Sequence, residues 1–153
     1  MLQNIPSKRI CWVDFYKKGY LNKFDKDLRL CPFMAEYKMI EDTKDAVGDT
    51  CAVAVRFAVD ELLGEDGLTH QGEGYDVVAM LAELPDLWDV NVSGWSNDSV
   101  TSRFGKEGHQ EKYISFVKGL TTKPVVGVGR YTSPDSMVSA IQRGVMDMIG
   151  AAR

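Results

Sequence analysis

The sequence lacks the features that mark membrane, secreted and nucleic-acid-binding proteins. Its 153 residues contain no apolar run of about 18 residues, the length that crosses a bilayer, and the N-terminus lacks the apolar core of a signal peptide. Acidic residues outnumber basic ones and the net charge is −4, whereas a protein that binds nucleic acid normally carries a basic face. We therefore expect a cytoplasmic protein that binds neither membrane nor nucleic acid.

Cysteine is scarce, and common catalytic motifs are missing. The three cysteines, Cys11, Cys31 and Cys51, are odd in number and widely spaced, so neither a disulfide framework nor a close pair of metal ligands is indicated. His70 and His109 have no third ligand in register, and we expect no metal site. The sequence has no G-x-S-x-G, P-loop or G-x-G-x-x-G motif. Serine-hydrolase, P-loop and Rossmann interpretations therefore have no motif support.

What the sequence does contain divides into two parts of opposite charge. Residues 1–33 hold seven lysines and arginines against three aspartates and glutamates, whereas residues 34–153 hold eleven against nineteen. The first part shows no clear periodicity beyond one strand-like run, and it is left as a poorly assigned N-terminal segment. With 44% hydrophobic residues the chain is long enough for one globular domain, which we place at 34–153.

From Met34 onward, strand-like runs alternate with helical ones. A helix is predicted at 34–47, where apolar residues recur near helical spacing and Gly48 provides a stop. Four strand-like runs follow, at 51–57, 87–94, 124–130 and 146–153. Helical segments separate them at 75–84, 110–120 and 133–144, the last with Ser133 as N-cap and Pro134 in the first turn. This alternation predicts an α/β protein with parallel strands joined by right-handed crossovers.

The pattern within the strands favours a barrel over an open sheet. Alternate strand residues face opposite sides, so Asp89 and Asn91 oppose Trp88 and two valines, and Arg56 shares its side with small residues. In an open doubly wound sheet both faces meet helices and both should be apolar. A barrel has one helix-covered side and a separate interior. We therefore predict that Arg56, Asp89 and Asn91 face the inner side of a barrel wall.

Arg56 is expected at the end of its otherwise apolar strand, where an unpaired charge is costly. Two interpretations stay open at this point. Arg56 forms an internal ion pair, with Asp89 as a candidate partner, or it contacts a ligand that is or becomes negative at this depth.

The stretch KPVVGVGRY, residues 123–131, supplies two glycines and then an arginine at a strand end. Glycine lets the backbone approach a ligand closely, and strand-end amides beside an arginine favour an anion such as phosphate. MIGAAR, residues 148–153, repeats the arrangement at the next strand end. Because the loops after the last two strands of a (β/α) barrel are a recurring phosphate site, the two motifs predict one shared phosphate.

The loop SGWSNDSVTSRF, residues 93–104, holds one large aromatic, Trp95, and an acid, Asp98. An indole face attracts alkylammonium groups, and a nearby carboxylate accepts a proton or balances charge. The alternative is a loop tryptophan that packs on its own barrel.

Three segments carry a family likeness: LPDLWDVNVSGWSNDSVTSRF, KPVVGVGRYTSPDSM and GVMDMIGAAR. They resemble the FMN-dependent Old Yellow Enzyme superfamily, and within it the branch of trimethylamine and dimethylamine dehydrogenases and related N-methyl amine or betaine demethylases. The likeness runs from about Glu41 to Arg153 and holds in order and spacing. It implies an FMN-dependent oxidoreductase with a (β/α)8 TIM barrel, of which this chain supplies the last four βα units.

The resemblance also implies roles for individual residues. Arg56 matches the arginine at the pyrimidine end of the flavin, where negative charge gathers on reduction. Trp95 matches an aromatic wall of the amine pocket, and Asp98 matches its acid, which makes these two the candidate catalytic residues. The FMN phosphate would be bound by two segments: Gly129, Arg130, Gly150, Ala151, Ala152 and Arg153.

Two departures from the family bear on function. The first four strands of the barrel have no recognisable counterpart in residues 1–33, and the cysteine cluster that binds a four-iron cluster in this branch has no counterpart in the sequence. We therefore expect about half a barrel, from an oxidoreductase acting on a small molecule such as a methylated amine or betaine. The alternatives are an ene-reductase of the same family that uses NAD(P)H, and a catalytically silent half-barrel whose open sheet edges are covered in a homo-oligomer or by a partner subunit.

Overall fold

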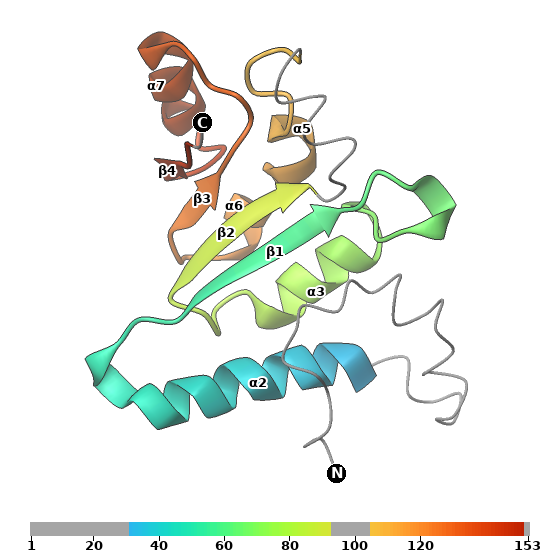
Figure 1. Ribbon diagram of the computed structural model, residues 1–153, viewed down its shortest axis with the longest axis vertical. Helices are drawn as coiled ribbons and strands as arrows, with labels where there is room; N and C mark the ends of the chain where they lie inside the picture. Colours follow the sequence, from blue (N-terminus) through green and yellow to red (C-terminus); the bar gives the residue numbers. More distant parts are fainter. Residues whose placement is uncertain (1–30, 93–104, 152–153) are drawn as a thin grey trace. The chain divides into compact units, whose positions relative to one another are not determined.

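The computed structural model describes residues 31–92 and 105–151, and the chain divides into two compact units, Met1–Cys51 and Ala52–Arg153 (Figure 1). In the first unit, helix α2 (Cys31–Val47) runs into a 3₁₀ turn, η3 (Gly48–Thr50). Gly48 has a φ of +53°, a left-handed conformation that glycine adopts without a steric penalty and that ends the helix. The helix predicted at 34–47 is confirmed, while the domain boundary at residue 34 stays a prediction.

The second unit is built on a four-stranded parallel sheet. Its strands are β1 (Ala54–Asp60), β2 (Leu87–Val92), β3 (Val125–Gly127) and β4 (Met148–Ile149), and they are adjacent in chain order. Each neighbouring pair is parallel. This confirms the predicted α/β architecture, and the sheet is consistent with one part of a barrel wall. The last two strands are shorter than predicted, because the chain leaves the ladder at Val128 and at Gly150.

Helices connect the strands. The β1–β2 connection contains a 3₁₀ turn, η4 (Gly64–Asp66), and α3 (Glu73–Leu81). The helix predicted at 110–120 is divided into α5 (Glu111–Ile114) and α6 (Val117–Leu120). The predicted start of α7 (Pro134–Gln142) is confirmed, since Ser136 N donates to the Ser133 side chain at 3.2 Å. Among residues 31–92 and 105–151, no helix is long and apolar enough to cross a membrane.

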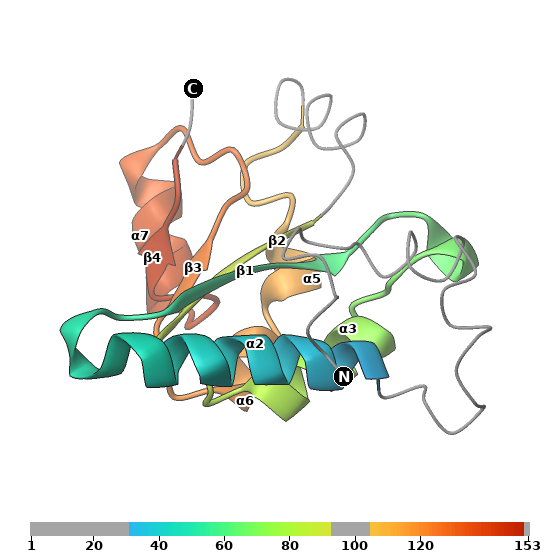
Figure 2. The same cartoon turned by 60° about the horizontal axis from the view of Figure 1, so that its bottom comes forward.

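One face of the sheet is covered by helices. Figures 1 and 2 show α3 and α5 against the strands β1 and β2, and α6 packs against α3. On that face Trp88, Val90 and Val92 are buried, and Trp88 Nε1 donates to Ala82 O at 3.0 Å just beyond α3. Helix α3 lies so close to β1 that a Cβ at Gly74 would come within 2.2 Å of Val59 O. The apolar side predicted for β2 is therefore its helix-covered side.

The opposite face carries the polar side chains, as the strand pattern predicted. The register places Arg56 beside Asp89, Asp89 beside Val126, and Val126 beside Met148, so these four residues form one row across the sheet. Neighbouring residues in parallel strands point to the same side. We call this side, which α3, α5 and α6 do not cover, the helix-free face of the sheet; it is charged at the β1 end of this row and apolar at the β4 end.

The N-terminal end of the sheet is closed by a repeated hydrogen-bond pair. Asp86, just before β2, accepts from Val53 N at 2.8 Å and returns its own amide to Val53 O at 2.8 Å. Asp147, just before β4, does the same with Val125, at 2.8 and 2.9 Å. Each aspartate thereby fixes the start of the preceding strand. In barrels, the N-terminal face typically contributes to stability, and hydrogen bonds that fix the strand starts are in keeping with that role.

Candidate functional site

Arg56 lies in the middle of β1, as the third residue of the strand, and the expectation that it ends the strand is wrong. The ladder with β2 continues through Phe57 and Ala58 to Asp60, which moves the strand end four residues onward. Arg56 still occupies the helix-free face beside Asp89. Arg56 therefore contacts groups within the face of the sheet and not groups at the C-terminal end of the strands.

The guanidinium of Arg56 has partners but remains accessible. Its Nη1 lies 3.5 Å from Asp89 Oδ2, and its side chain is 48% exposed. With its amide oriented to satisfy both groups, Asn91 accepts from Arg56 Nη2 at 3.2 Å and donates to Phe57 O at 3.3 Å. The ion pair considered from the sequence therefore forms. Because the N···O distance is long and about half of the Arg56 side chain is exposed, some guanidinium N–H groups remain available to a ligand on the same face.

Just after the C-terminal end of β3, two backbone amides have no partner among the residues that the structure describes. Gly129 is buried and its carbonyl accepts from Gly108 N at 2.8 Å. Within the part of the chain that the structure describes, the amides of Gly129 and Arg130 donate to no acceptor. Gly129 is buried and Arg130 is exposed. Because buried backbone amides are almost always paired, the free amide of Gly129 indicates a place for an acceptor group, which the neighbouring amide of Arg130 could also reach.

Arg130 adopts a backbone conformation that is rare for its type. Its φ is +58°, in the left-handed region, and its Nη1 donates to Gly105 O at 2.9 Å. A non-glycine residue in this region costs of order 1 kcal/mol and persists only where its surroundings hold it, which is common at ligand sites. The guanidinium is exposed and lies on the same residue as one of the two free amides. The turn thus combines a fixed cation with unpaired donors.

The turn after β3 is held by the segment before α5. Thr132 donates to Glu107 Oε1 through both its amide and its hydroxyl. Hydrogen bonds from the side chains of Thr132 and Ser136 and from backbone amides lower the pKa of Glu107 to about 2. Farther along, Tyr131 donates to Glu111 Oε1 at 2.8 Å, and Arg143 pairs with Glu111 Oε2 at 2.8 Å. The carboxylates near the turn are therefore already engaged.

The end of β4 lies beside the same turn. Gly127 pairs with Ile149 as the last residue of each strand, so Gly129 and Ala151 each follow the C-terminal end of one of these neighbouring strands by two residues. Gly150 has a packing reason for being glycine: its amide donates to Gly127 O at 2.8 Å, and a Cβ there would lie 2.8 Å from Val128 Cγ1. The predicted phosphate residues Gly129, Arg130, Gly150 and Ala151 thus share one edge of the sheet. Ala152 and Arg153, and the candidate catalytic pair Trp95 and Asp98, lie outside the described residues.

These donors fit a phosphate. Two amides that have no partner among the described residues and one guanidinium supply N–H groups for the oxygens of an anion, and Ala151 follows the end of the neighbouring parallel strand. The described residues contain no cluster of three or more histidine, cysteine or acidic side chains that could hold a metal ion.

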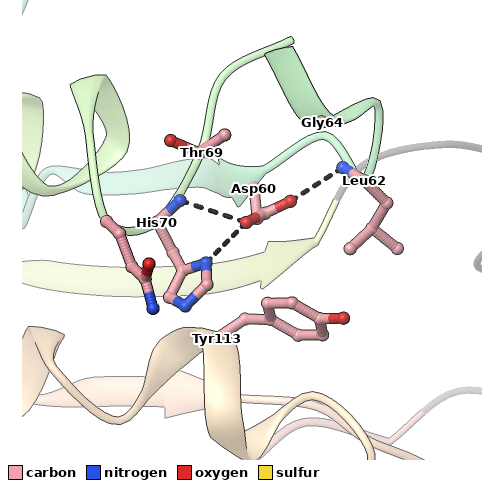
Figure 3. A pocket seen from close by; sticks show the side chains of 7 residues that line it. Asp60, Leu62, Gly64, Thr69, His70 and Tyr113 are labelled. Atoms are coloured by element: carbon pink, nitrogen blue, oxygen red, sulfur yellow. Dashed lines mark hydrogen bonds and ion pairs between the residues drawn. The ribbon is translucent and has the colours of Figure 1, made fainter.

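A second site lies where β1 ends, and the sequence analysis did not identify it. A pocket of about 570 Å³ is lined there by Asp60, His70 and Tyr113 among others (Figure 3). Burial raises the pKa of Asp60, but hydrogen bonds from His70 and from Leu62 N outweigh it, so the pKa of Asp60 lies below its usual range. Asp60 and His70 are joined by an irregular loop, and no periodic pattern in the sequence signals their contact.

A family model, a curated relative and two solved structures all relate this chain to flavin-dependent or amine-oxidising enzymes. A model of the NADH:flavin oxidoreductase / NADH oxidase family matches residues 30–153. Dimethylamine dehydrogenase of Hyphomicrobium sp. (strain x) is 39% identical over 117 residues, which cover 74% of this chain and 16% of that protein.

Two solved structures are also similar. The 6-hydroxypseudooxynicotine amine oxidase from Pseudomonas geniculata N1 is 61% identical with a TM-score of 0.74, over 78% of this chain and 18% of that one. Histamine dehydrogenase from Rhizobium sp. 4-9 is 46% identical with a TM-score of 0.71, over 78% and 17%. The chain spans less than a fifth of the length of each relative.

Proposed function

Because the chain belongs to the NADH:flavin oxidoreductase / NADH oxidase family, we propose that residues 34–153 form the C-terminal half of a flavin-binding barrel from an amine-oxidising enzyme. FMN is the cofactor of this family, and its members are oxidoreductases. The observation that carries the proposal is that the amides of Gly129 and Arg130 have no partner within the described ranges, just after the strand end where the family likeness predicts the FMN phosphate.

Each end of the cofactor would meet a different part of the sheet. The amides of Gly129 and Arg130 and the Arg130 guanidinium would hold the phosphate by charge-assisted hydrogen bonds. Arg56, two strands away on the helix-free face, would face the pyrimidine ring. Its fixed positive charge favours the electron-rich form of that ring. Asp89 and Asn91 orient the guanidinium for this task, since both contact it from β2.

The substrate class proposed is a small methylated amine or betaine. When bound, FMN would supply a hydride acceptor for the carbon next to an amine nitrogen that carries a lone pair, so a quaternary betaine nitrogen would not react in this way. Water would hydrolyse the resulting iminium to an amine and an aldehyde. Trp95 would form an aromatic wall for the cationic nitrogen, and Asp98 would handle a proton. The support for an amine is the trio of relatives, whose names are dimethylamine dehydrogenase, histamine dehydrogenase and an amine oxidase.

The proposal places this half-barrel in the cytoplasm as part of a larger assembly. Among the described strands, β1 and β4 form the two outer edges of the sheet. Open edges of a parallel sheet invite pairing, so a second copy or a separate partner subunit would cover them. A chain that folds but binds no flavin would instead be a silent half-barrel with only this structural role.

Bound flavin separates the two possibilities. The purified chain, incubated with excess FMN and freed of unbound ligand, is expected to retain a visible flavin absorption. Arg130→Ala should lose most of it, while Lys118→Ala, a cation at the opposite end of the sheet paired with Asp147 at 2.8 Å, should not. A wild-type chain that remains colourless and folded would contradict the proposal.

A further inference from the structure

The pocket at the end of β1 is built around a fixed carboxylate and imidazole. Asp60 Oδ2 accepts from His70 Nδ1 at 2.6 Å and from His70 N at 3.1 Å, while Oδ1 accepts from Leu62 N at 2.8 Å. The Asp60 side chain is only 8% exposed. Its oxygens are therefore engaged by the protein. Asp60 thus holds the His70 ring in place by hydrogen bonds and is not itself available to a ligand.

The contact with Asp60 decides which nitrogen of His70 is available. Since Nδ1 carries the hydrogen that Asp60 accepts, the neutral ring has its lone pair on Nε2. In the part of the chain that the structure describes, Nε2 has no partner. Tyr113, from α5, meets the ring edge to face, with centroids 5.1 Å apart and planes at 88°. Figure 3 shows both rings at the pocket, with dashed lines that join Asp60 to the His70 ring and backbone. The imidazole is thus held from two elements.

The residues that line the pocket carry negative charge, and this charge favours a cationic ligand. Of the described residues that line the pocket, only Asp60 carries a full charge when His70 is neutral, and none is a lysine or arginine. Thr69 and Gln71 add a hydroxyl and an amide. The cation nearby is Lys112, whose Nζ lies 4.5 Å from the Tyr113 ring centroid without lining the pocket. A negative, aromatic lining with a free acceptor nitrogen favours a cation that carries N–H groups.

We propose that this pocket binds the ammonium group of a small amine, with His70 Nε2 accepting a hydrogen bond from it. A pocket of about 570 Å³ has room for the amine and its substituents, within the size range of ligand sites. The residues that line this pocket do not include the predicted Trp95 and Asp98 pair, which belongs to the next βα loop in the sequence. The choice of amine as ligand rests on the proposed function, whereas the pocket and its charge do not.

The test follows backbone amide signals of Thr69, His70 and Gln71 in ¹H–¹⁵N NMR spectra of the chain without flavin. Dimethylammonium chloride should shift them saturably. Tetramethylammonium chloride, which has the charge but no N–H, should bind at least about tenfold more weakly, because it cannot donate to Nε2. Sodium acetate should produce no saturable shift. Equal binding of the two cations, preferred binding of acetate, or no saturation by dimethylammonium up to roughly 0.1 M would overturn the proposal.

A matched pair of variants locates the effect. His70→Phe keeps a ring against Tyr113 but removes the acceptor, and should weaken dimethylammonium binding at least about tenfold. His109→Phe replaces the other histidine, whose ring nitrogens are buried without a partner among the described residues, and should leave binding unchanged. Equal affinities in the two variants would contradict the proposal. Because no flavin is present, a failure here is separate from any failure of the chain to bind FMN.

Discussion

The two ends of this sheet are built in opposite ways. At the N-terminal end, Asp86 and Asp147 each exchange two hydrogen bonds with the start of the preceding strand. At the C-terminal end, Gly129 and Arg130 keep amides without partners in the described chain, and Arg130 holds a left-handed backbone. The difference suggests separate roles for the two ends of the sheet, stability at one and the proposed ligand binding at the other. Hydrogen bonds are completed at the end that serves stability, and they are left incomplete at the end where we propose that a ligand binds.

The side chains repeat this contrast. Near the N-terminal end, Trp88 Nε1 and Thr121 Oγ1 both donate to Ala82 O, at 3.0 and 2.6 Å, and Trp88 is fully buried. On the helix-free face, Arg56 remains half exposed despite its contact with Asp89. Variants that lower stability should therefore lie near the N-terminal end of the sheet, whereas variants that weaken flavin binding should lie on the helix-free face or at the C-terminal end.

The largest expected effect concerns catalysis. We expect the 153-residue chain mixed anaerobically with FMN and di- or trimethylamine to leave the flavin absorption unbleached. Holding reactants in place contributes roughly 7–11 kcal/mol to lowering a barrier, and the proposed half-barrel supplies one side of the pocket. Rapid, saturable bleaching that is lost in Asp98→Asn would show that the C-terminal end works alone, and the proposed half-site would be wrong.

Trp88→Ala should produce the largest loss of stability. Removing a fully buried tryptophan costs about 3–5 kcal/mol, which denaturant unfolding followed by circular dichroism will measure. Trp88→Phe keeps most of the buried volume and should lose far less. FMN affinity measured under folding conditions should be the same in Trp88→Phe and wild type. A weaker affinity in that variant would mean that the two ends are not separate.

Asp147→Asn should lower stability by up to about 1 kcal/mol, in a pH-dependent manner. Burial raises the pKa of Asp147, but hydrogen bonds from Lys118 and Val125 N outweigh it and the pKa lies below its usual range. A carboxyl with a lowered pKa stabilises the fold above its unfolded pKa of about 3.9, and that contribution is lost as the pH falls through the folded value. The difference between wild type and variant should therefore be constant near neutral pH and shrink below about pH 4. A difference that grows on acidification would contradict this assignment.

Arg130→Gly should have the smallest effect on stability and a clear effect on binding. Glycine relieves the left-handed strain but adds backbone freedom to the unfolded chain, so the free energy of unfolding should change by less than about 1 kcal/mol. The loss of the guanidinium should still weaken FMN binding by about tenfold or more. Thermal unfolding and calorimetric titration on the same sample will compare the two. Destabilisation without loss of affinity would assign Arg130 a structural role.

The contrast between the ends also explains what sequence reasoning could predict. The strand order, the helix-covered face and the Ser133 cap follow from local patterns, namely alternation, side-chain parity and a capping residue next to proline. The position of Arg56 did not follow, because the apolar run extends beyond it and pairing with β2 decides where β1 ends. The Asp60–His70 contact was also missed, since it depends on closure of an irregular loop. Gly150 was predicted to bind phosphate, and the structure adds a packing role beside Val128.

The most direct test of the account compares FMN with riboflavin by titration calorimetry of the purified chain. The two ligands share the ring and ribityl chain and differ in the phosphate that Gly129 and Arg130 are proposed to hold. Hydrogen bonds to a charged group contribute about 1.5–3 kcal/mol each, so FMN should bind at least about tenfold more tightly than riboflavin, and Arg130→Ala should reduce that difference. Riboflavin binding as tightly as FMN would contradict the claim that the C-terminal end of the sheet is a phosphate site.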